Sequence, residues 1–283
     1  MDTRYWLRQN TLGPQNPVPL NSAQYNEILT ARSILIDAKD FEERYEMVLG
    51  NFLDLERFFA AYAIEAHLRF DYDYKSLSAA FMDSNRRIMN LLTTFKSYID
   101  QTPRDFKSTE IDFKGQFLAG AKKTYDTSKA YRFVCALRNH TQHHSVPVHR
   151  IKGNPRTTPL PDRISFICEK QFLAENGDFK SSVLTEMEDN IDLRENFRQF
   201  MIELSKLHVS LRGEAAGAVK QAREVFEKAI EIFLEAQPAP ALALGLTICE
   251  KIDDEYIGPK SVMLDWDDTR IALTEKNRIL RID

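Results

Sequence analysis

An arginine and a histidine, Arg138 and His143, stand five positions apart, and the amide Asn139 directly follows the arginine. The guanidinium group is a planar fork of donors that suits the non-bridging oxygens of a phosphate. Imidazole titrates near neutral pH, where it can take a proton from one oxygen and return it to another. Together these residue types could bind a phosphodiester and move protons beside it without a metal ion.

The spacing of the pair restricts how it could act. On a continuous α-helix, five positions separate two side chains by about 140°, so Arg138 and His143 would not share a face. Either the helix frays near His143, as Ser145 and Pro147 suggest, or the two side chains converge on a groove between helices or between subunits.

The charge distribution points to the same part of the chain. The 283 residues carry a formal charge of −4, yet residues 101–160 hold eleven Lys and Arg against four Asp and Glu. Cations attract backbone phosphates whatever the base sequence, and aromatic rings can stack on bases. We therefore expect nucleic acid to contact the following side chains: Lys122, Lys123, Lys129, Tyr131, Arg132, His140, His144, Arg150 and Lys152. The alternative for each is a solvated surface, packing of the tyrosine, or a histidine contact with a helix end.

The run RNHTQH, from Arg138 to His143, resembles the Arg-x4-His motif of the HEPN superfamily, the higher eukaryotes and prokaryotes nucleotide-binding domain. The resemblance covers the motif and the helices before it, roughly residues 40–150. It implies an all-α bundle with the motif at a helix end, and a metal-independent ribonuclease formed where two copies meet in a homodimer. It also implies an RNA substrate, no cofactor, a role in phage defence or a toxin-like stress response, and a cognate inhibitor or partner protein.

The resemblance assigns the catalytic roles to Arg138, Asn139 and His143. His143 would be the general acid or base, and Arg138 would stabilise the phosphorane. Asn139 would hold the scissile phosphate or orient the imidazole. If a dimer brings two copies of His143 together, one can serve as base and the other as acid, which gives a 2′,3′-cyclic phosphate product.

Helices must position these residues. Apolar side chains recur in steps of four and three from Phe41 to Ala66, which predicts one buried helix face. A second helix is predicted over about 75–100, with Pro103 as its stop. A third runs from about residue 115 into the histidine cluster, where the apolar load shifts to Ala130, Phe133, Val134 and Leu137.

The predicted fold is mainly α, a HEPN-like helical bundle with an additional helical hairpin and a small C-terminal β element. We expect an extended, proline-containing arm over 1–22, the helical domain with the motif over 23–150, and a loop with a short strand over 151–180. A helical hairpin, broken at Gly213, should cover 181–237. The tail 238–283 should be a β-hairpin that turns at Gly258-Pro259, joined by the segment ending at Ile282.

Two other functions stay open. His140 and His144 are four apart, as zinc ligands on a helix are, and His149 could be a third ligand. Thr141, however, stands where an HExxH motif has its glutamate. The other alternative is a non-catalytic helical module that binds a nucleotide, a nucleic acid or a protein partner.

Cysteine spacing and hydropathy narrow the class of protein. The three cysteines lie far apart and form no CxxC pair, which suits a reducing compartment. The longest apolar runs, such as 239–246, are shorter than the roughly 20 residues of a membrane-spanning helix, and the N-terminus lacks a signal-peptide core. We expect a cytoplasmic protein with no membrane partner.

Overall fold

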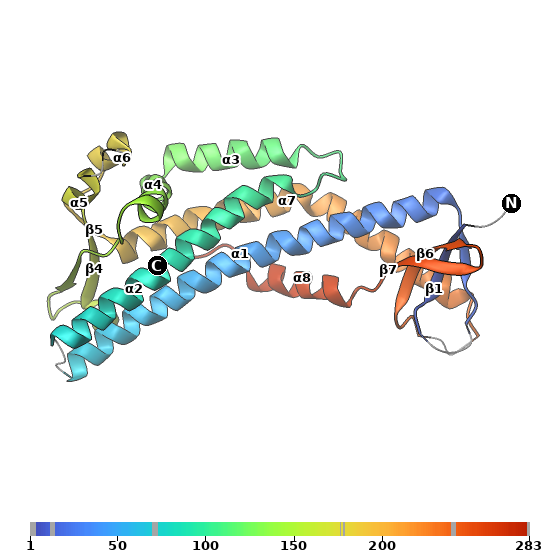
Figure 1. Cartoon of the computed structure of the whole chain (residues 1–283), viewed down its shortest axis with the longest axis horizontal. Coiled ribbons are helices and arrows are strands. Elements are labelled where there is room, and N and C mark those ends of the chain that lie inside the picture. The colour runs from blue at the N-terminus through green and yellow to red at the C-terminus, as the bar shows by residue number, and fades with distance from the viewer. Residues whose placement is uncertain are drawn as a thin grey trace. The chain divides into compact units, whose positions relative to one another are not determined.

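The computed structural model describes residues 4–11, 15–69, 73–175, 177, 179–238 and 242–281. In these ranges the chain is mainly helical and also forms two small antiparallel sheets (Figure 1). Its helices are α1 (Ser22–Arg69), α2 (Tyr74–Gln101), α3 (Phe113–Thr127), α4 (Lys129–His143), α5 (Lys170–Ala174), α6 (Ser181–Glu186), α7 (Leu193–Glu235) and α8 (Asp265–Lys276), with 3₁₀ turns at Thr102–Arg104 and Leu160–Asp162. Its strands are β1 (Tyr5–Gln9), β2 (Val18–Leu20), β3 (Arg150–Gly153), β4 (Ile164–Glu169), β5 (Asn190–Asp192), β6 (Leu246–Ile252) and β7 (Glu255–Ser261).

The chain divides into two compact units, and both α1 and α7 pass from one unit to the other. Unit 1 comprises Met1–Glu43, Arg104–Phe113 and Leu211–Lys276. Unit 2 comprises Arg44–Pro103, Lys114–Ser210 and Asn277–Asp283. These units differ from the expected succession of domains, because each one gathers segments from distant parts of the chain.

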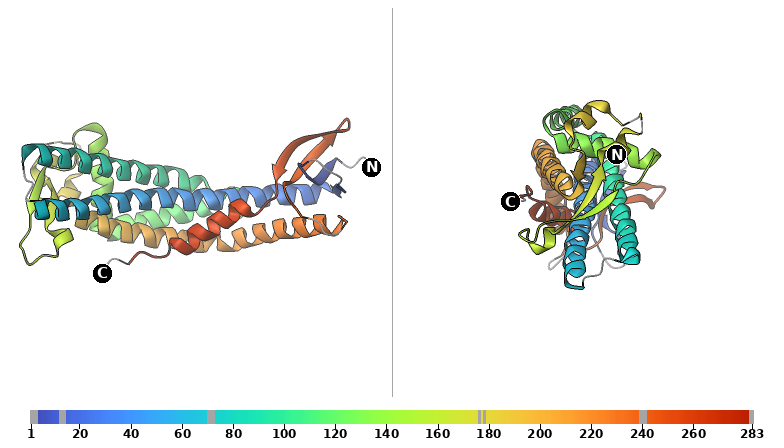
Figure 2. Two further views of the ribbon diagram at one scale, coloured as in Figure 1. Left: turned by 90° about the horizontal axis from the view of Figure 1, so that it is seen from below. Right: turned by 90° about the vertical axis from the view of Figure 1, so that its left-hand side faces the viewer.

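The sheet of unit 1 has the strand order β2-β1-β6-β7. β1 pairs antiparallel with β6, and Leu7, opposite Ile248, is fully buried. Figure 2 shows the β6–β7 hairpin beside the N-terminal strands. The expected extended arm is therefore wrong in part, since it contributes two strands to a sheet; its residues 1–3 and 12–14 lie outside the described residues.

The predicted C-terminal β-hairpin exists, but its turn is displaced. The chain reverses at Asp253 and Asp254, whose φ angles of 47° and 67° are left-handed. Two such residues between paired strands give a turn whose twist matches that of the strands. Gly258 and the proline after it lie inside β7 instead. The segment expected to join this sheet forms α8, and Ile282 lies outside the described residues.

The two long helices predicted before residue 101 are present as α1 and α2. The predicted apolar stripe of α1 is buried at nearly every position, among them Phe41, Tyr45, Val48, Phe52, Leu55 and Phe59. Asp73 caps α2 by accepting the N–H of Ser76 at 2.7 Å, which satisfies one of the unpaired donors of the first turn. The prolonged stripe was a reliable signal because burial of one helix face dominates helix formation in proteins.

The predicted break at Gly213 is absent, since α7 continues through it to Glu235. A glycine inside a helix costs only about 1 kcal/mol relative to alanine. Burial of the apolar stripe of α7 on both sides of Gly213 offsets that cost. The buried side chains are Leu204, Leu207, Leu211, Ala215, Ala222 and Phe226. The expected helical hairpin is thus one helix, preceded by the short α6 and β5.

Unit 2 holds the second sheet, in the order β3-β4-β5. The short strand expected within 151–180 is β4, which is buried from Ile164 to Cys168. β3 starts at Arg150, seven residues after α4 ends, so the sheet lies close along the chain to the histidine cluster.

Candidate functional site at the end of α4

The helix that carries the motif has clear limits at both ends. Ser128 caps it by accepting the N–H of Tyr131 at 3.1 Å. At the other end, the N–H of His144 donates to the carbonyl oxygen of His140 at 2.9 Å, and the helix ends at His143. The motif therefore occupies the last turns of α4, where the sequence predicted it.

The predicted shift of the apolar face in α4 is confirmed. The buried side chains are Ala130, Tyr131, Phe133, Val134, Leu137 and His140. Since α4 is helical through His143, fraying within the motif does not bring Arg138 and His143 to one face. The other predicted arrangement remains, in which they converge with groups from another helix or another subunit.

Arg138 is half-buried, and its hydrogen bonds are incomplete. Its Nη1 donates to Oδ1 of Asn139 at 2.7 Å. Its Nε is buried and makes no hydrogen bond within the described part of the chain. A buried donor without a partner is costly, and native structures hold few of them. Burial raises the pKa of the neighbouring Cys135 thiol to about 12, against the opposing effect of Arg138, so the thiol stays neutral and does not compensate the guanidinium.

The other two motif side chains, Asn139 and His143, are exposed. The His143 ring lies 6.3 Å from the ring of His144, which is also exposed. Neither Arg138 nor His143 lines any of four cavities found within the two units. The motif is thus a group of surface side chains on one helix end, without a cleft of its own among those cavities.

The remaining histidines of the cluster are more enclosed. His140 is 3% exposed, and its ring lies 5.8 Å from Phe179 and 5.7 Å from His144. Burial lowers the pKa of His140, and the positive charges of His144 and His149 lower it further. His149 Nδ1 accepts the N–H of Glu169 at 2.9 Å. Burial also lowers the pKa of His149, against the raising effect of Glu169. These contacts favour a packing role for His140 and His149.

Some of the cationic side chains that were expected to contact nucleic acid form ion pairs within the protein, and others do not. Arg132 donates to the carbonyl oxygens of Tyr125 and Asp126 and pairs with Glu186 at 2.7 Å. Arg150 pairs with Glu169 at 3.0 Å, and Lys122 pairs with Asp126 at 2.5 Å. These cations are wholly or partly engaged within the protein.

The three other lysines of the set, Lys123, Lys129 and Lys152, are exposed and have no ion pair among the described residues. Lys129, however, lines a cavity of about 620 Å³ whose other charged side chains are Glu188, Asp192, Glu195 and Glu203. The carboxylates there oppose the phosphate attraction that the sequence assigned to Lys129.

Tyr131 does not offer the stacking surface that the sequence suggested. The side chain is 3% exposed, and its ring lies 5.7 Å from Phe95 and 5.6 Å from Phe200. Burial raises the pKa of its hydroxyl. The alternative given for this residue, packing inside the helical layer, describes its position.

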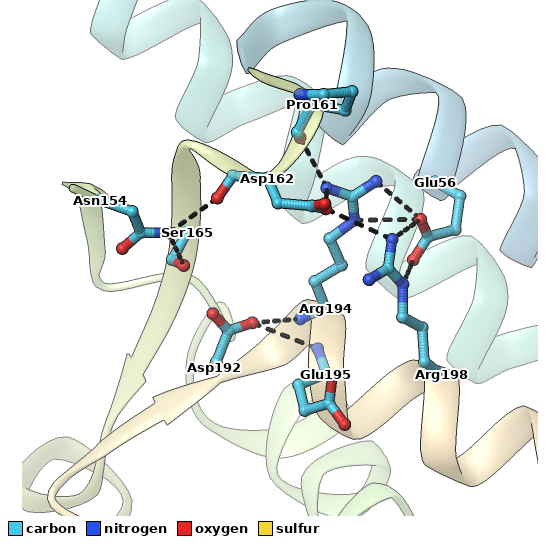
Figure 3. Close-up of polar contacts among 9 residues, drawn as sticks. All are labelled: Glu56, Asn154, Pro161, Asp162, Ser165, Asp192, Arg194, Glu195 and Arg198. Carbon is cyan, nitrogen blue, oxygen red and sulfur yellow. Dashed lines mark hydrogen bonds and ion pairs between the residues drawn. The ribbon is translucent and has the colours of Figure 1, made fainter. Parts of the chain in front are cut away.

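Sequence reasoning missed an arginine cluster in unit 2, drawn in Figure 3. Arg194, on the first turn of α7, donates to Glu56 at 3.0 Å and to Asp162 at 2.6 Å. Arg198 donates to both oxygens of Glu56 at 2.9 Å. The two arginines and their two carboxylate partners come from three separate segments. The only sequence signal for this cluster is the spacing of four between the arginines on α7.

Neither a metal centre nor a membrane span is found in the described part of the chain. No group of three or more His, Cys, Asp or Glu side chains there could hold a metal ion, so the alternative zinc site of His140, His144 and His149 is not assembled. No helix in the same ranges is both long enough and apolar enough to cross a bilayer. Comparisons with protein-family models, with curated proteins and with solved structures give no match to this chain.

Proposed function

We propose that the end of α4 is one half of a metal-independent ribonuclease site, with Arg138, Asn139 and His143 as its catalytic residues. The observation that carries the proposal is the half-buried Arg138, five positions before the exposed His143. Its side chain donates to Asn139 at 2.7 Å, and its buried Nε has no partner among the residues that the structure describes. The motif resembles that of HEPN ribonucleases, whose function in phage defence or stress responses is part of the same proposal.

The proposed reaction needs a base, an acid and a cation. One His143 takes the proton of the ribose 2′-hydroxyl while that oxygen bonds to phosphorus. Arg138 stabilises the charge on the phosphorane oxygens. The bond from phosphorus to the 5′-oxygen then breaks, and a second His143 gives that oxygen its proton. The products are a 2′,3′-cyclic phosphate and a free 5′-hydroxyl, and neither a metal nor a redox partner enters the balance.

A second copy of the chain would supply the second histidine. Because α4 is helical through His143, one chain presents Arg138 and His143 on different faces of the helix. Two helix ends that meet about a twofold axis would place an imidazole on either side of one phosphate. Lys123 and Lys152 are the exposed cations of the predicted set that remain available for the RNA backbone.

The experiment uses the full chain with EDTA and end-labelled RNA. We expect cleavage products that end in a 2′,3′-cyclic phosphate, and a loss of about 10²- to 10⁴-fold in rate for His143→Ala. His144→Ala is the matched control, because it removes an exposed imidazole one residue further on. If the unaltered protein binds RNA but never cuts it, the non-catalytic module replaces this proposal.

Mixed dimers test the second histidine. Chains of wild type and His143→Ala, combined in known ratios, should lose activity as the square of the wild-type fraction, because a dimer with one histidine lacks either the acid or the base. A linear decline would show that each chain works alone, which contradicts the shared site.

A further inference from the structure

Unit 1 contains a cavity that none of the proposed RNA chemistry uses. It measures about 310 Å³ and lies between α1, α7 and α8, which run side by side in Figure 2. Its apolar lining consists of Ala38, Phe41, Phe106, Ala215, Ala216 and Val219. Small-molecule sites in proteins have volumes from about 300 Å³ upward and are mostly apolar, with a few placed polar groups.

The polar groups of this cavity are strongly biased towards positive charge. Arg212, Lys220, Arg223 and Arg270 line it, and Glu42 is the one carboxylate among its described lining residues. Glu42 is already held by Arg212, which donates to both of its oxygens at 2.7 Å. A ligand that enters would meet cations and hydrocarbon.

A buried carboxylate fixes two of these cations in place. Asp267, on α8, is fully buried and accepts from Arg223 at 2.6 Å and from Arg270 at 2.6 Å and 3.0 Å. Burial raises the pKa of Asp267, but the hydrogen bonds from Arg270 and Arg223 outweigh it and lower the pKa overall. Arg223 also pairs with Glu227 and Asp268, each at 3.0 Å, so Asp267 is the anion that holds Arg270, and none of these three carboxylates lines the cavity.

Arg270 keeps a donor available for a ligand. Its Nε and Nη2 are used by Asp267, while its Nη1 makes no hydrogen bond to the described part of the chain. Lys220 is the second cation, since its side chain is 80% exposed and its ion pair with Glu224, at 3.7 Å, is long. Both residues line the cavity together with the rings of Phe41 and Phe106.

We propose that this cavity binds a small organic carboxylate with an apolar body, its carboxylate on Arg270 and Lys220 and its hydrocarbon against Phe41, Phe106 and Val219. A guanidinium fork matches a carboxylate geometrically, and the charge-assisted bond is strongest where water is partly excluded. The apolar lining contributes to the binding free energy in proportion to the ligand surface that it removes from water. A long acidic peptide would require an extended groove, whereas this cavity is compact.

The test is isothermal titration calorimetry of the full chain with decanoate, below its micelle concentration and without RNA. Decanol and decyltrimethylammonium have a tail of the same length with a neutral and a cationic head. We expect saturable binding of decanoate at one site per chain, and binding at least tenfold weaker for the other two compounds, because a bond to a charged group would be lost. Equal binding of decanol, or no binding of decanoate, would overturn the proposal.

Variants locate the site. Arg270→Gln should weaken decanoate binding about tenfold or more, and Lys220→Glu about two- to fivefold, because the lysine is exposed and screened. Ala216→Trp, at an exposed position on the rim, should block entry. The matched controls are Lys260→Glu on β7 and Gln221→Trp on α7, which are exposed and do not line the cavity.

Since Ala216 and Lys220 are exposed, these two variants keep the experiment informative even where Arg270→Gln disturbs the buried Asp267. Unchanged decanoate affinity in both Ala216→Trp and Lys220→Glu would show that decanoate binds elsewhere and would refute the assignment. RNA cleavage plays no part in the measurement, so this result is independent of the nuclease proposal.

Discussion

Arg194 and Arg138 both lie on helices of unit 2, yet their guanidinium groups have opposite hydrogen-bonding states. Arg194 is 7% exposed, and all three of its nitrogens have acceptors among Glu56, Asp162 and the carbonyl of Pro161. Arg138 bonds only Asn139 through Nη1, and its buried Nε has no partner in the described residues. The two residues are alike in sequence type and local secondary structure, and they differ in what surrounds them.

The difference separates an arginine that joins segments from one that is available to a ligand. A guanidinium group with every donor satisfied by carboxylates and carbonyls can accept no phosphate without losing a partner. A guanidinium group with an idle, partly desolvated donor gains a partner when an anion arrives. On this criterion we propose Arg138 and Arg270 as binding residues, whereas Arg194 joins three segments of unit 2.

The largest stability effect should follow from Arg194→Ala. Arg198 still pairs with Glu56, and Asp162 is partly exposed, so the loss of the Arg194 hydrogen bonds should cost about 2 to 3 kcal/mol. Arg138→Ala should cost about 1 kcal/mol or less, since it removes one bond to an exposed amide. Urea unfolding of both variants measures the contrast, and equal losses would contradict the distinction between them.

Acid should reduce stability through the buried histidine of the same helix end. Burial sets the pKa of His140 below its ordinary value of about 6.5. The neutral His140 therefore contributes fully to the free energy of unfolding above pH 6.5, the pKa of an unfolded histidine. This contribution is lost as the pH falls below that value and through the lower pKa of the folded protein. We expect a smaller difference between the free energies of unfolding at pH 7.5 and 5.0 in His140→Phe than in wild type.

Gln142→Ala is the control for that measurement, because it alters an exposed position of α4 that does not titrate. His149, whose pKa is also lowered, should leave part of the pH dependence in place. A pH dependence that is unchanged in His140→Phe would show that other groups cause it.

The smallest change in stability is expected at Gly213, which belongs to neither of the two proposed binding sites and so serves as a reference for them. Gly213 lies within α7, and a Cβ added there meets nothing within 4 Å. Gly213→Ala should raise the free energy of unfolding by about 0.5 to 1 kcal/mol, because alanine loses less backbone entropy in a helix. A loss of stability in thermal or urea unfolding would mean that the helix needs the glycine. RNA cleavage and decanoate binding should not change.

The sequence predicted the elements whose signal is local and repeated. The stripe from Phe41 to Ala66 gave α1, and α4 ends at His143 as the motif required. It did not predict β1, whose partner β6 lies more than two hundred residues later, since no local pattern specifies so distant a pairing. The predicted helix break at Gly213 was wrong, because the buried apolar side chains on both sides of it outweigh the low helix propensity of glycine.

The candidate site at the end of α4 was likewise predictable only where its signal is local. Residue types placed Arg138, Asn139 and His143 at the surface end of one helix, but types alone could not show that Tyr131 is buried or that Arg132 is bound to Glu186. The cavity beside α8 was missed because its cations come from two helices separated by some fifty residues, and because the segment that forms α8 was expected to be a strand.

The pairing of β1 with β6 has a consequence for biosynthesis. Trp6 and Cys249, which face each other across these strands, are 243 residues apart. On the ribosome, β1 emerges long before β6. Although β2 can pair with one edge of β1, the other edge stays open until β6 has been translated, and open edges invite association with other chains. The sheet of unit 1 can therefore be completed only after β6 has been translated, and a nascent chain arrested before residue 246 should depend on chaperones to stay unaggregated.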